Sequence, residues 1–189
     1  MLKEGDSEKA VVLAHGYDQD LNEDQDYFIT LSESLQEHGL CVYRFSFKQT
    51  TLSDEIEQLE NRVQEVRNHH KKVFLVGQST GGIVSAFQKV PVDYMVLTFP
   101  VVDARKTFDR LSETHVVPEK WLEDAEKYDL TGKRLDAFMF YSDKDEYIDL
   151  REYESVDCEK ELLEGWCHGP SNQEQIRFLC ERVALKLQR

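Results

Sequence analysis

The order of apolar and polar positions along the chain predicts strands that alternate with helices. Short runs rich in β-branched and aromatic residues, bounded by polar segments, are typical of strands buried within a sheet. Runs of this kind cover residues 10–14, 41–47, 73–76, 94–99, 137–141 and 162–167. The segments between them carry apolar residues at helical spacing, so we expect helices there.

The helix that follows the second run has the plainest pattern. Leu52, Ile56, Leu59, Val63 and Val66 recur every three or four positions and therefore share one face. Acidic residues gather at its beginning and basic residues at its end, which suits the helix dipole. Further helices are expected over residues 23–38, from the turn at 77–82 to about 89, and over 176–187, the last with a capping box at Ser171 and Glu174.

Strands and helices that alternate this regularly predict βαβ units, and hence a mostly parallel sheet of about six strands with helices on both faces. The stretch 101–134, between the fourth and fifth strands, breaks the pattern and carries only a short helix over about 118–128. The sequence has no internal repeat, low-complexity tract or linker. We expect one α/β domain over residues 1–189, with 101–134 as an insert.

Composition places the chain among globular proteins. Hydrophobic residues make up 40% of its 189 residues, which is enough to build a core without disulfide or metal support. No apolar run approaches the ~18 residues that a membrane span needs. The N-terminal segment lacks the apolar middle of a secretory signal, so we expect a cytoplasmic protein.

Charge and cysteine usage exclude further classes. Asp and Glu total 37 against 23 Lys and Arg, a formal net charge of −14, and such a surface disfavours nucleic acid and anionic membranes because phosphate binding needs clustered cations. The four cysteines form no C-x-x-C pair and are expected to be reduced thiols: Cys41, Cys158, Cys167 and Cys180. No cluster has metal-ligand spacing, so we expect neither a metal nor another cofactor.

The segment from Gly77 to Gly81 reads G-x-S-x-G and directly joins a predicted strand to a predicted helix. This is the context of a nucleophile elbow, a turn so tight that its central side chain is strained and exposed. The flanking glycines relieve the crowding, and the N-terminus of the following helix favours negative charge at the same place. We predict that Ser79 is a nucleophile.

A nucleophilic serine needs a base, and the base needs an acid that orients it. Five of the six histidines precede the serine, lie at predicted helix ends or fall in the insert: His15, His38, His69, His70 and His115. His168 alone follows a late strand and opens a loop before the final helix. We therefore predict that His168 is the base.

The acid is expected between the serine and the histidine, at the carboxyl end of a strand. Asp143 and Asp145 both follow the fifth predicted strand. Asp145 is favoured because it lies further into the loop, where its carboxylate can turn toward His168. Asp103, just past the fourth strand, is a third candidate.

These motifs resemble the α/β-hydrolase superfamily, and the resemblance covers nearly the whole chain. The matching segments are His15-Gly16, residues 77–81, residues 142–145 and residues 167–169. The resemblance implies an α/β-hydrolase fold in which the backbone N–H groups of Tyr17 and Thr80 form the oxyanion hole and His15 is structural. It also favours Asp145, since members commonly read Gly-x-x-Asp there, with Ser142 replacing the glycine.

The sequence departs from the family pattern in two places. The chain begins almost at the family's third strand, so its first two strands are expected to have no counterpart. The cap domain is reduced to about residues 101–134. The chain is therefore similar to small, minimally capped esterases and to lysophospholipase- or thioesterase-like hydrolases.

These residues together predict hydrolysis of carboxylic esters by acyl transfer through Ser79, Asp145 and His168. A thioesterase or peptidase with the same residues, or an idle binding protein on the same fold, are the alternatives. The expected partner is a small acyl substrate, with the chain as a monomer or homodimer.

Two segments beside the predicted site bear on its substrate. Acidic residues crowd the predicted oxyanion loop and favour neutral, short to medium acyl groups over acyl-coenzyme A: Asp18, Asp20, Glu23, Asp24 and Asp26. In the insert, Trp121, Leu122 and Tyr128 either form a lid over the acyl pocket or pack their helix onto the body.

Overall fold

The computed structural model describes residues 1–22, 26–48 and 50–188, and in them seven strands form one sheet in the order β1-β3-β2-β4-β5-β6-β7. The strands are β1 (Leu2–Glu4), β2 (Lys9–Ala14), β3 (Cys41–Arg44), β4 (Lys72–Gln78), β5 (Tyr94–Thr98), β6 (Arg134–Ser142) and β7 (Asp157–Leu163). Neighbouring strands run parallel except β1, which is antiparallel to β3. The prediction of a mostly parallel sheet is confirmed.

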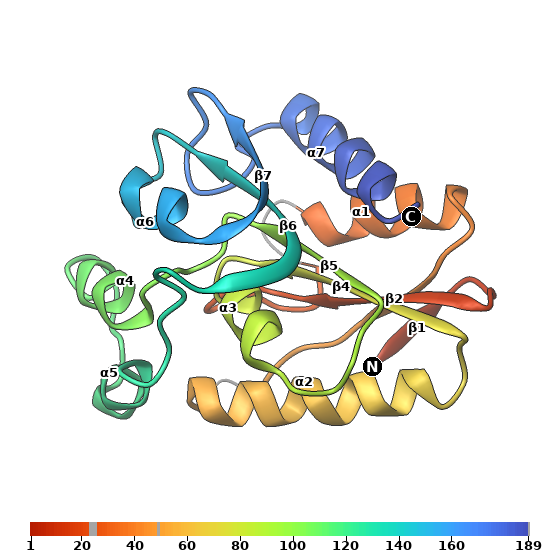
Figure 1. Cartoon of the computed structure of the whole chain (residues 1–189), viewed down its shortest axis with the longest axis horizontal. Helices are drawn as coiled ribbons and strands as arrows, with labels where there is room; N and C mark the ends of the chain where they lie inside the picture. Colours follow the sequence, from red (N-terminus) through yellow and green to blue (C-terminus); the bar gives the residue numbers. More distant parts are fainter. Residues whose placement is uncertain (23–25, 49, 189) are drawn as a thin grey trace.

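Helices cover both faces of this sheet, as predicted (Figure 1). They are α1 (Tyr27–Glu37), α2 (Leu52–Arg67), α3 (Thr80–Phe87), α4 (Ala104–Leu111), α5 (Glu119–Ala125), α6 (Leu150–Ser155) and α7 (Gln173–Lys186). α1 and α7 lie on one face, and α2 and α3 lie on the other, while α4, α5 and α6 gather toward one end of the sheet (Figure 1).

The central strand β2 shows how the sequence pattern makes these layers. Side chains on a strand point alternately to its two faces. Val11 and Leu13 therefore pack into the core under α1 and α7, whereas Ala10, Val12 and Ala14 pack toward α2 and α3. Because both faces are buried, the strand reads as a continuous apolar run.

β1 is a strand that the sequence pattern does not predict. Its three residues pair with Val42, Tyr43 and Arg44 of β3, so the expectation of no strand before residues 10–14 is wrong. Glu4 accepts hydrogen bonds from the largely buried guanidinium of Arg44, at 2.8 Å from Nε and 2.9 Å from Nη2. A short edge strand fixed by an ion pair carries no apolar run by which it could be found.

The strand expected over residues 162–167 lies earlier in the chain, as β7. β7 is the opposite edge of the sheet, and most of its residues are polar and partly exposed. An edge strand with one solvated face does not need an apolar run, which explains the misplacement. α7 also begins differently from the prediction, because Asn172 rather than Ser171 accepts the hydrogen bond from the N–H of Gln175.

The insert at 101–134 carries two helices where one was predicted. α5 is shorter than the expected 118–128, and α4 precedes it. Asp103 caps α4 by accepting the N–H of Lys106 at 3.1 Å. An isolated antiparallel bridge between Asp103 and Asp129 joins the two ends of the segment that contains both helices.

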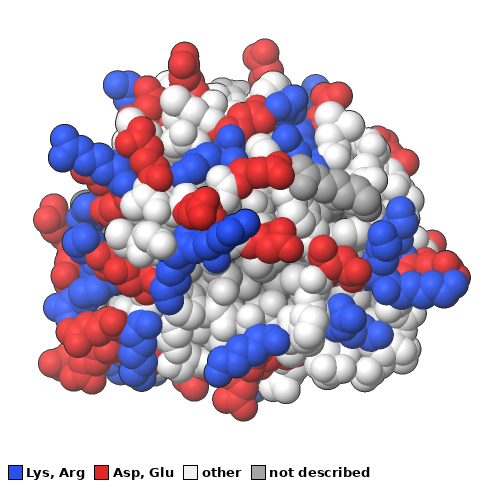
Figure 2. Space-filling view, viewed as in Figure 1, with Lys and Arg blue, Asp and Glu red and all other residues white. Residues whose placement is uncertain are grey.

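Within the part of the chain that the structure describes, no helix is long and apolar enough to cross a membrane. All four cysteines are free in the structure. On the face drawn in Figure 2, Lys and Arg side chains lie interspersed with Asp and Glu.

The turn between β4 and α3 depends on glycine for space. A Cβ on Gly81 would collide with the backbone carbonyls of Ala14 and His15, and one on Gly77 would lie 2.5 Å from the carbonyl oxygen of Gly81. Neither glycine has positive φ, so close packing of the backbone is what requires them. This turn therefore presses α3 directly against the end of β2.

We predict that Gly81→Ala lowers the free energy of unfolding by about 2–3 kcal/mol, because backbone atoms must move to admit the methyl group. Urea denaturation followed by circular dichroism measures this. Gly132→Ala is the control: Gly132 has φ 70° and open space around it, so its loss costs only about 1 kcal/mol of backbone strain. Equal effects of the two substitutions would contradict the crowding argument.

Candidate active site

Ser79 stands at the turn between β4 and α3, where the sequence places it. Its backbone has φ 52° and ψ −118°, a conformation that a residue with a side chain rarely adopts. The strain is held in place because the N–H of Ser79 donates to the carbonyl of Thr98 at 3.0 Å on the neighbouring strand. The hydroxyl therefore faces away from the sheet, at the N-terminus of α3.

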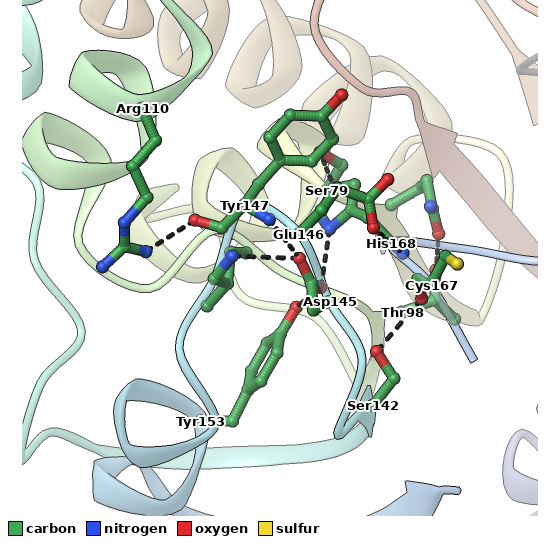
Figure 3. Close-up of polar contacts among 12 residues, drawn as sticks. Ser79, Thr98, Arg110, Ser142, Asp145, Glu146, Tyr147, Tyr153, Cys167 and His168 are labelled. Carbon is green, nitrogen blue, oxygen red and sulfur yellow. Dashed lines mark hydrogen bonds and ion pairs between the residues drawn. The ribbon is translucent and has the colours of Figure 1, made fainter. Parts of the chain in front are cut away.

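His168 reaches Ser79 from a loop that lies 89 residues later in the chain. Its Nε2 is 2.7 Å from Oγ of Ser79, and its Nδ1 is 2.7 Å from Oδ2 of Asp145 (Figure 3). Because a carboxylate only accepts, Nδ1 carries the proton and Nε2 of the neutral ring accepts from the serine hydroxyl. The three side chains thus form one hydrogen-bonded row.

Asp145 is the most enclosed member of the row, with a side chain that is 0% exposed. Its Oδ1 accepts the backbone N–H groups of Tyr147 and Ile148, both at 2.9 Å, and its Oδ2 accepts the hydroxyl of Tyr153 at 2.5 Å. Burial alone would raise the pKa of Asp145, but the hydrogen bonds from His168, Tyr153 and the backbone outweigh burial and lower it. The carboxylate therefore stays ionised.

The two other candidate acids have different partners. Asp143 accepts the N–H of Gly165 at 2.6 Å, and Asp103 caps α4 and pairs with Lys106. Neither is bonded to His168. The preference for Asp145 over both therefore matches the side chain that lies beside the histidine.

The loop after β2 brings Tyr17 to the same place, next to Thr80 at the start of α3. His15 fixes this loop from below: its Nε2 accepts the N–H of Phe47 at 2.9 Å, so its protonated Nδ1 donates to the carbonyl of Gly16 at 2.8 Å. His15 is 0% exposed, and its burial lowers its pKa from the ordinary value of 6.5. Both ring nitrogens of His15 are thus bonded to the backbone.

A pocket with a volume of about 270 Å³ opens beside Ser79 and His168. Tyr17, Tyr147 and Phe108 supply aromatic surface, while Asp18 and Glu146 supply carboxylates. Among the described residues that line it, none is Lys or Arg. Across the described ranges, no three His, Cys, Asp or Glu side chains lie close enough together to hold a metal ion.

Comparisons with known proteins bear on the fold. Neither a protein-family model nor a curated protein matches the chain. Solved structures do match: an esterase of Pyrococcus furiosus is 21% identical with a TM-score of 0.73, covering 97% of this chain and 83% of its own. The esterase Est1E of Butyrivibrio proteoclasticus is 13% identical with a TM-score of 0.73, covering 97% and 88%.

A third structure decides the fold. It is described as a putative hydrolase of the alpha/beta superfamily from Xanthomonas campestris, is 16% identical with a TM-score of 0.68, and covers 95% of this chain and 98% of its own. The chain has the α/β-hydrolase fold. In this fold the carboxyl ends of the parallel strands form one edge, where β4, β6 and β7 lead to Ser79, Asp145 and His168.

In this α/β-hydrolase fold, helix α5 of the insert does not form a lid over the pocket. Trp121, Leu122 and Tyr128 are absent from the described residues that line the pocket. Trp121 is 1% exposed and packs edge-on against Tyr17 and Phe108, and the hydroxyl of Tyr128 is bonded to Ser53 at 2.7 Å. The packing alternative therefore describes these residues, and the substrate-contact alternative does not.

Among the described residues, α4 is the helix of the insert that lines the pocket, and the sequence pattern does not predict it. Thr107, Phe108 and Leu111 face the cavity, and His115 follows them at its rim. Ala104, Thr107, Phe108 and Leu111 have helical spacing after the capping Asp103, so a signal for the helix was present. Glu146 and Tyr147 also line the pocket, but only the folded loop shows this.

We predict that the α/β-hydrolase fold of this chain loses stability as the pH falls below about 6.5, in part through His15. The pKa of His15 is lowered in the folded chain, so the unfolded chain binds its proton first and unfolding becomes easier. Urea denaturation at several pH values measures the slope. His15→Gln keeps an acceptor for Phe47 without titrating, so its slope should be shallower, and an unchanged slope would contradict the assignment.

Proposed function

We propose that the chain is a serine hydrolase that cleaves carboxylic esters through an acyl-enzyme. The observation that carries this proposal is the hydrogen-bonded row of Asp145, His168 and Ser79 at the wall of a pocket. The esterases among the solved structures with the same fold support an ester as the bond that is cleaved.

The first half of the reaction follows from the two bonds of His168. Nε2 takes the proton of Ser79 while Oγ attacks the acyl carbonyl, and Asp145 stabilises the imidazolium that forms. His168 then gives that proton to the leaving alcohol. In the second half, water attacks the acyl-enzyme, and the same two residues assist it in the same way.

The negative charge that develops on the substrate oxygen needs hydrogen-bond donors on the far side of Ser79. We assign this role to the backbone N–H groups of Tyr17 and Thr80. Support comes from their place in the pocket wall and from the N-terminus of α3, whose dipole favours an anion there. His15 holds the loop that carries Tyr17 and keeps its donor in position.

The pocket suits a small, uncharged acyl ester. Its volume of about 270 Å³ lies below the range of roughly 300–1,000 Å³ that is common for drug-sized ligands. Aromatic and aliphatic side chains give it apolar surface. Asp18 and Glu146 lie in the wall without any lining Lys or Arg among the described residues, so a polyanionic substrate is repelled. Of the acidic residues noted in the oxyanion loop, Glu23 and Asp24 lie outside the described residues.

We predict that Ser79→Ala abolishes labelling by a fluorophosphonate probe and lowers kcat/KM for p-nitrophenyl butyrate by about a thousandfold or more. Ser85→Ala is the matched control. Ser85 lies on α3, is 0% exposed, and its hydroxyl has no hydrogen-bond partner in the described structure. The control should label and turn over substrate as the wild type does.

The same experiment separates the alternatives. A wild-type chain that is not labelled and does not cleave a panel of p-nitrophenyl esters is a binding protein on this fold. Faster cleavage of aminoacyl anilides than of esters would make it a peptidase. Either result contradicts the proposed esterase.

We predict that p-nitrophenyl butyrate is turned over at least about tenfold more efficiently than butyryl-coenzyme A, because Asp18 and Glu146 repel the phosphates. Asp18→Asn should lower the ratio of the two kcat/KM values. Added salt should lower the same ratio in the wild type. Asparagine tolerates the left-handed backbone of Asp18, where φ is 56°, so the substitution removes charge alone. Preference for the coenzyme A ester would contradict the argument.

A further inference from the structure

The loop that carries Asp145 continues into α6, a helix of six residues that the sequence pattern does not predict. Asp149 caps it by accepting the N–H of Arg151 at 2.9 Å. One turn later, Tyr153 points back beneath the loop and is 0% exposed. Its hydroxyl lies directly under the carboxylate of Asp145 (Figure 3).

The two oxygens of Asp145 are used differently. Oδ1 is taken up by two backbone N–H groups of its own loop, from Tyr147 and Ile148. Oδ2 accepts from Nδ1 of His168 at 2.7 Å and from the hydroxyl of Tyr153 at 2.5 Å. The histidine and the tyrosine therefore share one oxygen, and a donor on that oxygen withdraws charge from the bond to His168.

The position of the Tyr153 hydroxyl is fixed from two sides. On one side, Nζ of Lys160 on β7 donates to the carbonyls of Tyr153, Glu154 and Val156 at the end of α6. On the other side, Arg110 of α4 donates to Oε1 of Glu152 at 2.7 Å. The same guanidinium donates to the carbonyl of Tyr147 at 2.6 Å (Figure 3). Helix α6 is thereby held against both the sheet and the insert.

The phenol also remains a donor over the range in which an esterase works. Burial, and then the charge of Asp145, raise the pKa of Tyr153 well above its ordinary value. A carboxylate that is buried with an ionised neighbour would be destabilised, whereas one bonded to a neutral hydroxyl is not. The pair is therefore a phenol donating to a carboxylate.

We propose that Tyr153 is a positioning residue of the site: its hydroxyl fixes Asp145 and, by sharing Oδ2 with His168, limits how strongly the carboxylate holds a proton on the imidazole. This inference rests on the proposed function for its catalytic meaning. The consequence is that the strength of the bond between Asp145 and His168 depends on a hydroxyl that lies outside the pocket.

The first test is Tyr153→Phe, measured as kcat and KM for p-nitrophenyl butyrate from about pH 5 to about pH 9. Without the hydroxyl, Oδ2 holds the imidazolium more strongly, and the acidic limb of the kcat/KM profile should move up by about one pH unit. At neutral pH, kcat should fall about tenfold with KM little changed, because Tyr153 does not line the pocket.

Tyr141→Phe is the matched control. Its ring packs 5.5 Å from that of Tyr153, and no hydrogen bond joins its hydroxyl to Asp145 or His168 in the described structure. The control loses the same phenol hydroxyl from the same cluster and should keep the wild-type pH profile. A shift of equal size in both variants would show a general packing effect and overturn the proposal.

A second measurement does not depend on activity, and its arm with 3-fluorotyrosine does not depend on the folding of Tyr153→Phe. NMR titration of the His168 ring should show a midpoint that is higher in Tyr153→Phe and lower in a chain with 3-fluorotyrosine at position 153, whose hydroxyl is a stronger donor. Titration midpoints that equal the wild-type midpoint, or that move in the opposite directions, overturn the proposal. If a fluorophosphonate probe does not label the wild type, the proposed function is wrong. The NMR titration still decides the role of Tyr153 in that case.

Discussion

The side chain of Asp145 is fully buried beyond the end of β6, and its two oxygens accept four hydrogen bonds, one of them from Nδ1 of His168. A buried charge is tolerated only when it is paired and bonded in this way. Because the carboxylate is fixed, the imidazole has one orientation and one free nitrogen, and that nitrogen faces Ser79. The geometry of the whole site follows from this one carboxylate.

The sheet supplies the other constraint. Parallel strands end at one edge, so β4, β6 and β7 deliver a serine, an aspartate and a histidine to one place although Ser79 and His168 are 89 residues apart. Crowding at Gly77 and Gly81 and the strained φ of Ser79 direct the hydroxyl out of the sheet. Helix α4 then closes the pocket, and its Arg110 ties that helix to the loop of Asp145.

Features written in local sequence could be predicted, and features made by tertiary contact could not. Ser79 lies between two glycines, and a buried strand precedes and a helix follows this segment. Its turn can therefore be recognised from the sequence. Asp145 could be favoured over Asp143 by its place further into the loop and by the family resemblance. The bond from Tyr153 had no sequence signal, because it joins a six-residue helix to a loop. Edge strands β1 and β7 were missed or misplaced since solvated strands carry mixed polar residues.

The claim that Ser79 attacks an ester with the help of His168 is tested most directly by trapping the acyl-enzyme. The chain is mixed with a p-nitrophenyl ester, quenched in acid within the first turnovers, digested and weighed by mass spectrometry. We expect one added acyl group on the peptide that carries Ser79, and much less of this acylated peptide in His168→Ala. Ester cleavage without acylated Ser79, or an acyl group on another residue, would contradict it.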